Sequence, residues 1–198
     1  VLELGGSDPY LILDDADLDL AVEACATSRL LNSGQSCIAA KRFLVVPSVR
    51  EAFERRLVER MKITRMGDPE HEETQLGPQA RADLRASLHA QVQASVAGGA
   101  RLLLGGSLPS GPGYFYPPTV LTDVKKGMVA YKEELFGPVA TIIPVKNRAD
   151  AIKIANDTAF GLGAAVFSRD DARAERIAVD DLEAGAAFVN AFVRSDPR

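Results

Sequence analysis

The chain has 198 residues, of which 46% are hydrophobic and 25% charged, with a formal net charge of −4. These proportions are ordinary for a globular protein, and the length suffices for one domain with a sizeable core. The acidic balance gives no sign of the basic patch that nucleic-acid binding requires. No apolar run approaches the roughly 20 residues of a membrane-spanning helix. We therefore expect one globular domain with neither a nucleic-acid nor a membrane partner.

The two cysteines, Cys25 and Cys37, are too few for a disulfide framework. Together with the absence of a signal-peptide pattern, they lead us to expect a reducing, cytoplasmic compartment. The chain begins at Val1 rather than at Met and ends at Arg198, just after a strand-like run. We expect it to be a piece of a larger protein.

The first third of the chain predicts a strand, a helix, a turn and a second strand. Residues 10–13 form the first strand, and apolar residues at helical spacing predict a helix over 17–31 with Asp17 as its N-cap. Residues 32–34 should end that helix, because Asn and Gly tolerate the left-handed conformation. A strand over 42–46 follows.

The middle third is dominated by two helices. Residues 49–64 predict an amphipathic helix, and residues 79–97 a second helix ended by a glycine pair. Residues 102–104 resemble a buried strand. A loop rich in Gly and Pro spans residues 105–118.

The last third alternates strands and helices. Strands are expected over 140–145, 164–168 and 187–190, with helices over 149–155 and 170–179 between them. This alternation predicts the α/β class, with an open, largely parallel sheet and helices on both faces.

Several common binding motifs do not occur in the sequence. No G-x-G-x-x-G fingerprint follows a strand, and no phosphate-binding P-loop is found. The only histidines, His71 and His89, are far apart and lack Cys or carboxylate partners at ligand spacing. We expect no metal site.

The segment of greatest interest is residues 32–37, Asn-Ser-Gly-Gln-Ser-Cys. It places Cys37 in a short turn between the predicted helix and strand, and such turns often carry functional residues. A buried, inert cysteine is the alternative, because free cysteines are often packed in cores. The polar neighbours of Cys37 argue against an apolar pocket, whereas Cys25 lies within a helix and should be packed.

Two further segments accompany this one. Residues 1–6, Val-Leu-Glu-Leu-Gly-Gly, place Glu3 34 residues before Cys37, and residues 133–139, Glu-Glu-Leu-Phe-Gly-Pro-Val, follow much later. In this order and spacing, the three segments resemble the aldehyde dehydrogenase superfamily along the whole chain. The resemblance is to the catalytic domain, over residues 1–198. It implies that the N-terminal cofactor domain and the C-terminal oligomerisation segment are absent, and that the full-length parent is a homo-oligomer.

The resemblance assigns roles to four residues. Cys37 matches the family's nucleophile and Glu3 its general base. Glu134 matches the residue that binds the nicotinamide ribose, and Phe136 is expected near the nicotinamide of NAD or NADP. The implied reaction forms a thiohemiacetal and then a thioester, which water hydrolyses. In the alternative interpretation, Glu3 is a surface carboxylate, and Glu134 and Phe136 belong to a turn before a strand, with Phe136 in the core.

Three other residues have two interpretations each. Lys41 and Arg42 follow Cys37 closely enough to lower the pKa of its thiol, unless their side chains point away. Asn190 matches the end of a family strand near the active-site funnel, and it is otherwise a structural residue.

The substrate class rests on a narrower resemblance, to bacterial succinate-semialdehyde dehydrogenases. Residues 32–42, 66–69 and 116–121 carry it. A carboxylated substrate calls for an Arg or hydroxyl clamp, and many members of that branch have Arg where this chain has Leu31. Arg29, or Arg194 with Ser195, could replace it, or the clamp could lie in the cofactor domain. A neutral aliphatic aldehyde therefore stays open as the substrate.

Two other classes of function remain. Cys37 and Glu3 could form a cysteine hydrolase without a cofactor, although no histidine is placed as a partner. The chain could also be a fragment without dehydrogenase activity, retaining only esterase activity of the thiol.

Overall fold

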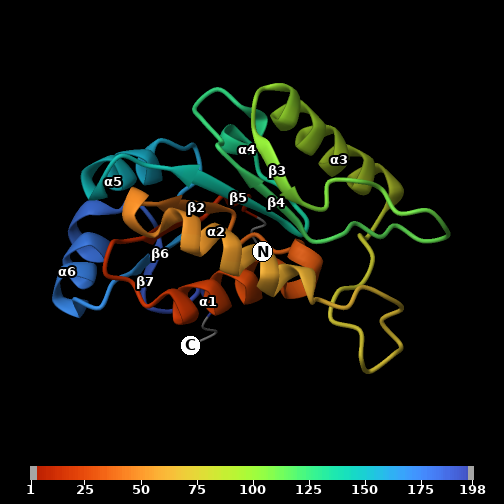
Figure 1. Ribbon diagram of the computed structural model, residues 1–198, viewed down its shortest axis with the longest axis horizontal. Coiled ribbons are helices and arrows are strands. Elements are labelled where there is room, and N and C mark those ends of the chain that lie inside the picture. The colour runs from red at the N-terminus through yellow and green to blue at the C-terminus, as the bar shows by residue number, and fades with distance from the viewer. Residues whose placement is uncertain (1–3, 196–198) are drawn as a thin grey trace.

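Seven strands form one sheet in the order β3-β4-β5-β2-β1-β6-β7 (Figure 1). This computed structural model describes residues 4–195, so Glu3 lies outside the described residues. The strands are β1 (Pro9–Ile12), β2 (Arg42–Val45), β3 (Arg101–Leu104), β4 (Thr119–Thr122), β5 (Val139–Pro144), β6 (Gly163–Phe167) and β7 (Ala186–Val189).

All neighbouring strands run parallel except β3 and β4, which are antiparallel. The expectation of an open, largely parallel sheet is thus confirmed. β3 and β7 are its two edge strands, and β2 and β1 lie at its centre.

Helices cover both faces of the sheet, as the sequence predicts for this class. They are α1 (Leu18–Leu30), α2 (Pro47–Lys62), α3 (Ala82–Ala97), α4 (Val129–Lys132), α5 (Arg148–Asn156) and α6 (Asp171–Arg176), with a 3-10 turn at Leu31–Gly34 and a π-helical turn at Ile177–Asp181. α1 and α2 pack on one face, and α3 to α6 pack on the other.

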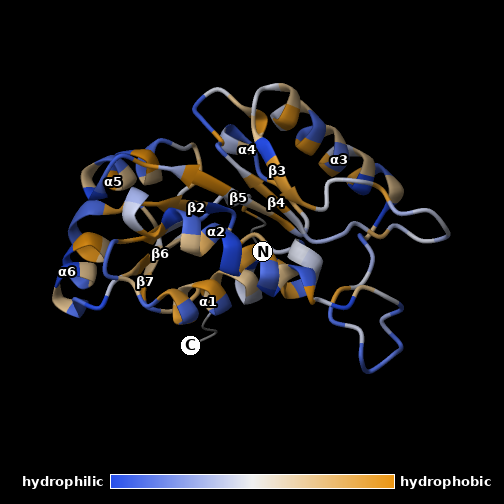
Figure 2. Ribbon diagram, in the orientation of Figure 1, coloured by the Kyte–Doolittle hydropathy of each residue, from blue (hydrophilic) through white to orange (hydrophobic). Residues whose placement is uncertain are grey.

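The central strands are buried on both faces, so they read as continuous apolar runs. In β1, Tyr10 and Ile12 face the α1 and α2 side, whereas Leu11 faces α3 to α6. This alternation is the two-residue period of a strand, and covered parallel sheets need apolar residues on both sides. Figure 2 shows the resulting concentration of hydrophobic residues in the strands.

The end signals of α1 appear as predicted. The Asp17 carboxylate accepts hydrogen bonds from the backbone N–H groups of Asp19 and Leu20, so it is the N-cap. After the helix, Asn32, Ser33 and Gly34 adopt φ values of 51°, 56° and 73°. Three consecutive left-handed residues turn the chain sharply toward Cys37.

Some expected elements are different in the structure. The strand β3 is not buried: Leu102 is 39% exposed, because β3 is an outermost strand with a partner on one side only. No strand or helix was expected where β4 and α4 lie. α2 begins at Pro47, before the expected start at residue 49, because proline is favoured at the first position of a helix.

Over residues 4–195, no helix combines the length and the apolar character needed to cross a membrane. The same residues contain no group of three or more His, Cys, Asp and Glu side chains that could hold a metal ion.

Candidate active site

Three segments that are far apart in the sequence meet at the amino ends of three adjacent strands. Gly5 and Gly6 precede β1, Cys37 precedes β2, and residues 134–137 precede β5. These strands are neighbours, in the order β5-β2-β1. Open parallel sheets usually bind ligands at the carboxyl ends of their strands, so this location is the reverse of the general rule.

Glycines allow the three segments to approach backbone to backbone. A Cβ atom on Gly6 would lie 2.0 Å from the carbonyl oxygen of Cys37. One on Gly34 would lie 2.2 Å from the carbonyl carbon and oxygen of Gly137. No side chain fits in either place, and glycine is the residue that permits such contact.

Cys37 is half-buried and opens into a cavity of about 440 Å³. The other lining residues come from all three segments: Leu4, Gly5, Gln35, Ser36, Glu134 and Phe136. Among the described residues, the Cys37 N–H has no hydrogen-bond acceptor. Cys25, by contrast, is fully buried in α1, and burial raises the pKa of its thiol well above the usual value.

Lys41 lies beneath the Cys37 turn and is 1% exposed. Its ammonium group donates to the carbonyl oxygens of Ser36, Cys37 and Ala39 at 3.2, 3.1 and 3.0 Å. Burial, and next the positive charge of Arg29, lower the pKa of Lys41 to about 7, although nearby negative groups oppose the shift.

Arg42 points away from the thiol, so the suggestion that it acts on Cys37 is wrong. Its guanidinium donates to the carbonyl oxygens of Ser7, Ile154 and Ala155. It thereby ties the entry of β1 to the end of α5.

Glu134 is held at the mouth of the cavity by two contacts. Its Oε1 atom accepts a hydrogen bond from the Gly6 N–H at 3.0 Å and lies 3.8 Å from the Lys41 ammonium. Phe136 is 38% exposed and lines the same cavity, so it is not the core residue of the alternative interpretation.

Arg29 cannot serve as a substrate clamp in this arrangement. Its side chain is fully buried, and its guanidinium donates to the Gly34 carbonyl oxygen at 2.7 Å. The structure therefore contradicts that suggestion. Arg194 is exposed, and its guanidinium lies 4.7 Å from the centre of the Phe192 ring.

Asn190 lies at the opposite ends of the strands from Cys37, beyond the carboxyl end of β7. Its amide exchanges hydrogen bonds with the Ser168 backbone and donates to Asp171. These contacts fasten the chain after β6 and β7, which agrees with the structural interpretation and not with a place near the cavity.

Supporting residues outside the three segments were not identified from the sequence. Ser28, buried in α1, accepts a hydrogen bond from the Ala40 N–H at 3.0 Å, and Gln79 donates to the Ser33 carbonyl oxygen. Both side chains fix the turn that carries Cys37. A polar residue on the apolar face of a predicted helix was the available signal for Ser28; Gln79 offered none.

Asp8 is a further buried charge near the site, and no pattern in the sequence indicated it. It is 1% exposed, and its Oδ1 atom accepts a hydrogen bond from the Gly163 N–H at 3.1 Å. Burial raises the pKa of Asp8 to about 6, although Lys41, this hydrogen bond, Arg42 and Arg29 all act to lower it.

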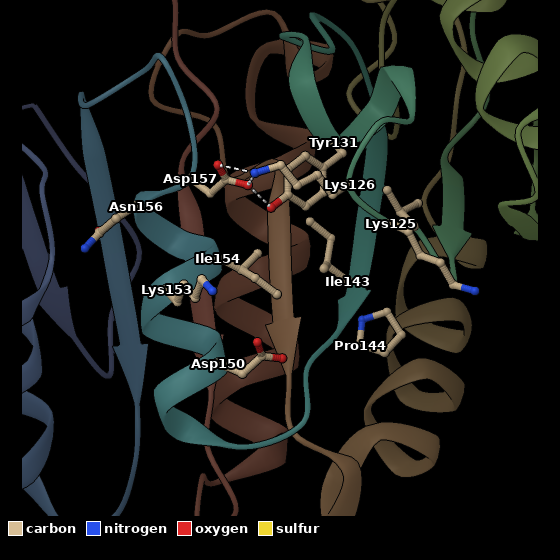
Figure 3. A pocket seen from close by; sticks show the side chains of 11 residues that line it. Lys125, Lys126, Tyr131, Ile143, Pro144, Asp150, Lys153, Ile154, Asn156 and Asp157 are labelled. Atoms are coloured by element: carbon tan, nitrogen blue, oxygen red, sulfur yellow. Dashed lines mark hydrogen bonds and ion pairs between the residues drawn. The ribbon is translucent and has the colours of Figure 1, made fainter.

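A larger cavity, of about 600 Å³, lies elsewhere, beside α5 and β5 (Figure 3). At one end of it, Asp157 accepts a hydrogen bond from the Tyr131 hydroxyl at 2.6 Å and pairs with Lys126 at 2.8 Å. Ile143, Pro144 and Ile154 give it apolar walls. No cysteine lines this cavity, so its size does not make it the site of thiol chemistry.

Comparison with known proteins identifies the family of the chain. The sequence model of the aldehyde dehydrogenase family matches residues 1–198. The chain therefore belongs to the aldehyde dehydrogenase family.

Individual relatives within the family are dehydrogenases of named aldehydes. Over the whole chain it is 50% identical to the succinate semialdehyde dehydrogenase [NAD(P)+] Sad of Escherichia coli, covering 43% of that protein. It is 48% identical to a succinate-semialdehyde dehydrogenase [NADP(+)] of Mycolicibacterium paratuberculosis, covering 42% of it. The solved lactaldehyde dehydrogenase of Escherichia coli superimposes on 98% of this chain with a TM-score of 0.95 and 36% identity, over 41% of its own length. The chain thus spans less than half the length of these relatives.

Proposed function

We propose that residues 1–198 form the thiol-bearing catalytic domain of an NAD(P)-dependent aldehyde dehydrogenase that oxidises succinate semialdehyde to the acid. The observation that carries the proposal is the shared cavity: the Cys37 thiol opens into the space lined by Glu134 and Phe136. Family membership supports the reaction class, and the two bacterial relatives support both the substrate and the cofactor.

Cys37 is the nucleophile in this mechanism. Its thiolate attacks the aldehyde carbon, and the carbonyl oxygen becomes an oxyanion. The Cys37 N–H, which has no acceptor among the described residues, donates to this oxygen. The product is a thiohemiacetal on Cys37.

Glu134 and Phe136 fit a bound nicotinamide. The two oxygens of a carboxylate suit the vicinal hydroxyls of a ribose, and an exposed aromatic ring offers a flat apolar surface. When bound, NAD(P)+ supplies the hydride acceptor. Cys37 then carries a thioester, and Glu3 acts as the base that activates water to hydrolyse it.

Succinate semialdehyde carries a carboxylate, which needs a cationic or hydroxyl partner. With Arg29 buried, exposed Arg194 and its neighbour Ser195 are the candidates in this chain. A neutral aliphatic aldehyde is the alternative substrate, because Leu31 is 51% exposed and apolar where a clamp would be expected. The similarity to a lactaldehyde dehydrogenase supports this alternative more weakly, because its identity of 36% is lower than the 50% and 48% of the two succinate-semialdehyde dehydrogenases.

We also propose that the rest of the cofactor site and the oligomerisation segment lie outside residues 1–198, and that the full-length enzyme is a homo-oligomer. The relatives are more than twice as long as this chain. Residues 1–198 also contain no glycine-rich phosphate fingerprint.

Two cysteine variants of the full-length enzyme test the function. Cys37→Ala should abolish NAD(P)+ reduction by succinate semialdehyde, because the nucleophile is lost. Cys25→Ala is the matched control, since Cys25 is fully buried in α1, and it should retain most of the turnover. Full turnover in Cys37→Ala, or no reduction by the native enzyme with any aldehyde, would refute the proposal.

A Glu3→Gln variant tests the hydrolytic step separately. Gln keeps the shape of Glu3 but removes the basic oxygen, so turnover should fall by roughly 10²–10⁴-fold. Thioester formation should be affected less, so a rapid burst of about one reduced cofactor per site is expected in stopped-flow absorbance. Wild-type turnover in this variant would exclude Glu3 as the base.

A further inference from the structure

Lys41 uses all of its hydrogen-bond donors within one turn. An ammonium group has three N–H donors, and here the acceptors are the carbonyl oxygens of Ser36, Cys37 and Ala39. Among residues 4–195, the nearest carboxylate oxygen is on Glu134, 3.8 Å away and beyond hydrogen-bond distance. Lys41 therefore acts chiefly on the backbone of the turn.

The direction of these carbonyl groups fixes the direction of the next N–H groups. In a planar trans peptide, the C=O bond and the following N–H bond point to opposite sides. Because the Ser36 carbonyl group points toward the Lys41 ammonium, the Cys37 N–H, which belongs to the same peptide group, points away from Lys41. Lys41 is buried and does not line the cavity, whereas Ser36 and Cys37 do.

We propose that Lys41 is a positioning residue that aims the Cys37 N–H at the oxyanion formed during attack by the thiolate. This inference rests on the proposed function of Cys37 as a nucleophile. The positive charge of Lys41 adds to the effect, since a polarised peptide group is a stronger donor. Lys41 itself touches neither the substrate nor the cofactor.

Within the described part of the chain, the charges around Lys41 come from four segments. Arg29 approaches from α1, Asp8 from the segment before β1, Glu134 from the segment before β5, and Cys37 from the turn itself. A role limited to charge would affect the reactivity of the thiolate in every reaction. A role in aiming the N–H should affect only reactions that develop an oxyanion.

Two reactions of Cys37 separate these roles. Alkylation by iodoacetamide needs the thiolate but forms no oxyanion. Acylation by p-nitrophenyl acetate also needs the thiolate, and its tetrahedral intermediate carries an oxyanion before p-nitrophenolate leaves. The ratio of the acylation rate to the alkylation rate therefore measures oxyanion stabilisation alone.

In Lys41→Met we expect this ratio to fall at least about tenfold, because loss of one oxyanion donor costs roughly 10²–10³-fold and misaiming removes part of that. Lys62→Met is the matched control, since Lys62 is exposed at the end of α2, and it should keep the native ratio. Alkylation at Cys37 and not Cys25 is checked by peptide mass.

Lys41→Arg keeps the charge but spreads its donors over a planar fork, so it cannot serve three carbonyls that converge on one nitrogen. The ratio of the acylation rate to the alkylation rate should therefore fall in Lys41→Arg as well. If Lys41→Met does not fold, Lys41→Arg alone tests the positioning role. An unchanged ratio in the folded variants, or an equal fall in both rates, would overturn the positioning role. If the native protein is not acylated while Cys37 is alkylated normally, the proposed function fails, and the role of Lys41 fails with it.

Discussion

At the scale of single residues, surroundings distinguish groups of the same chemistry. Cys25 and Cys37 are both free thiols, yet one is sealed in the core and the other opens into a cavity. Lys41 and Arg42 are adjacent cations, yet one binds the turn of Cys37 and the other binds the end of α5. The polar sequence around Cys37 indicated the first distinction. Nothing in the sequence indicated the second, because it depends on the direction in which each side chain points at the start of β2.

Asp8 gives a pH dependence of stability with a definite sign. Its pKa in the folded protein is about 6, against the usual 3.8, so between these values the folded state holds more protons than the unfolded state. The free energy of unfolding must therefore fall as the pH rises from about 4 to about 6. At about 1.4 kcal/mol per unit of pKa, the loss is roughly 2–3 kcal/mol.

Asp8→Asn should remove this loss, because Asn does not titrate and its amide oxygen can still accept the Gly163 N–H. Carboxylates with lowered pKa values, such as Asp15 and Asp123, change stability in the opposite direction and are present in both proteins. The quantity to measure is thus the native-minus-variant difference in urea unfolding free energy at each pH. A difference that stays constant from pH 4 to pH 6 would show that Asp8 titrates normally.

At the scale of elements, the sequence predicted those with strong local signals. The cap at Asp17 and the left-handed end of α1 were readable because capping and glycine preferences are local. β3 was predicted but wrongly placed in the core, since an edge position depends on distant strands. β4 was missed because it directly follows the long loop rich in Gly and Pro, where no strand was expected.

The contact between the Cys37 turn and the segment before β5 predicts the effect of Gly34→Ala. At φ +73°, alanine is strained by roughly 1–2 kcal/mol. Its Cβ would also meet Gly137 backbone atoms at 2.2 Å, adding roughly 1–3 kcal/mol of overpacking. The free energy of unfolding should fall by roughly 2–5 kcal/mol, and acylation of Cys37 should slow as the turn is displaced.

Gly111→Ala is the control for this variant. Gly111 also has a positive φ, of +107°, but nothing lies within 4 Å of its added Cβ. Gly111→Ala should therefore lower the free energy of unfolding only through backbone strain, and it should leave acylation of Cys37 unchanged. Equal losses of stability in the two variants would mean that the segments are not packed tightly at Gly34.

At the scale of the whole molecule, the site depends on strand order. The three segments meet only because β5, β2 and β1 are neighbours and parallel, so their amino ends lie at one edge. Strand alternation in the sequence predicted the parallel sheet but not the order of its strands. The resemblance to a family could group Cys37 with Glu134, whereas the residues alone gave no reason to bring them together.

The same architecture predicts what residues 1–198 can do on their own. Glu134 and Phe136, which line the Cys37 cavity, are the proposed contacts to the nicotinamide end of a dinucleotide, but the sequence has no glycine turn at a helix N-terminus for the phosphates. Isolated residues 1–198 should therefore reduce no NAD(P)+ with succinate semialdehyde in an absorbance assay. Cys37 should still be acylated by p-nitrophenyl acetate, because the turn, Lys41 and the Cys37 N–H all belong to this chain.

A cooperative unfolding transition by circular dichroism must accompany the assay, so that misfolding is not mistaken for inactivity of the folded protein. Robust cofactor reduction by these 198 residues would show that they hold a complete dinucleotide site, and the proposed division of the enzyme would be wrong.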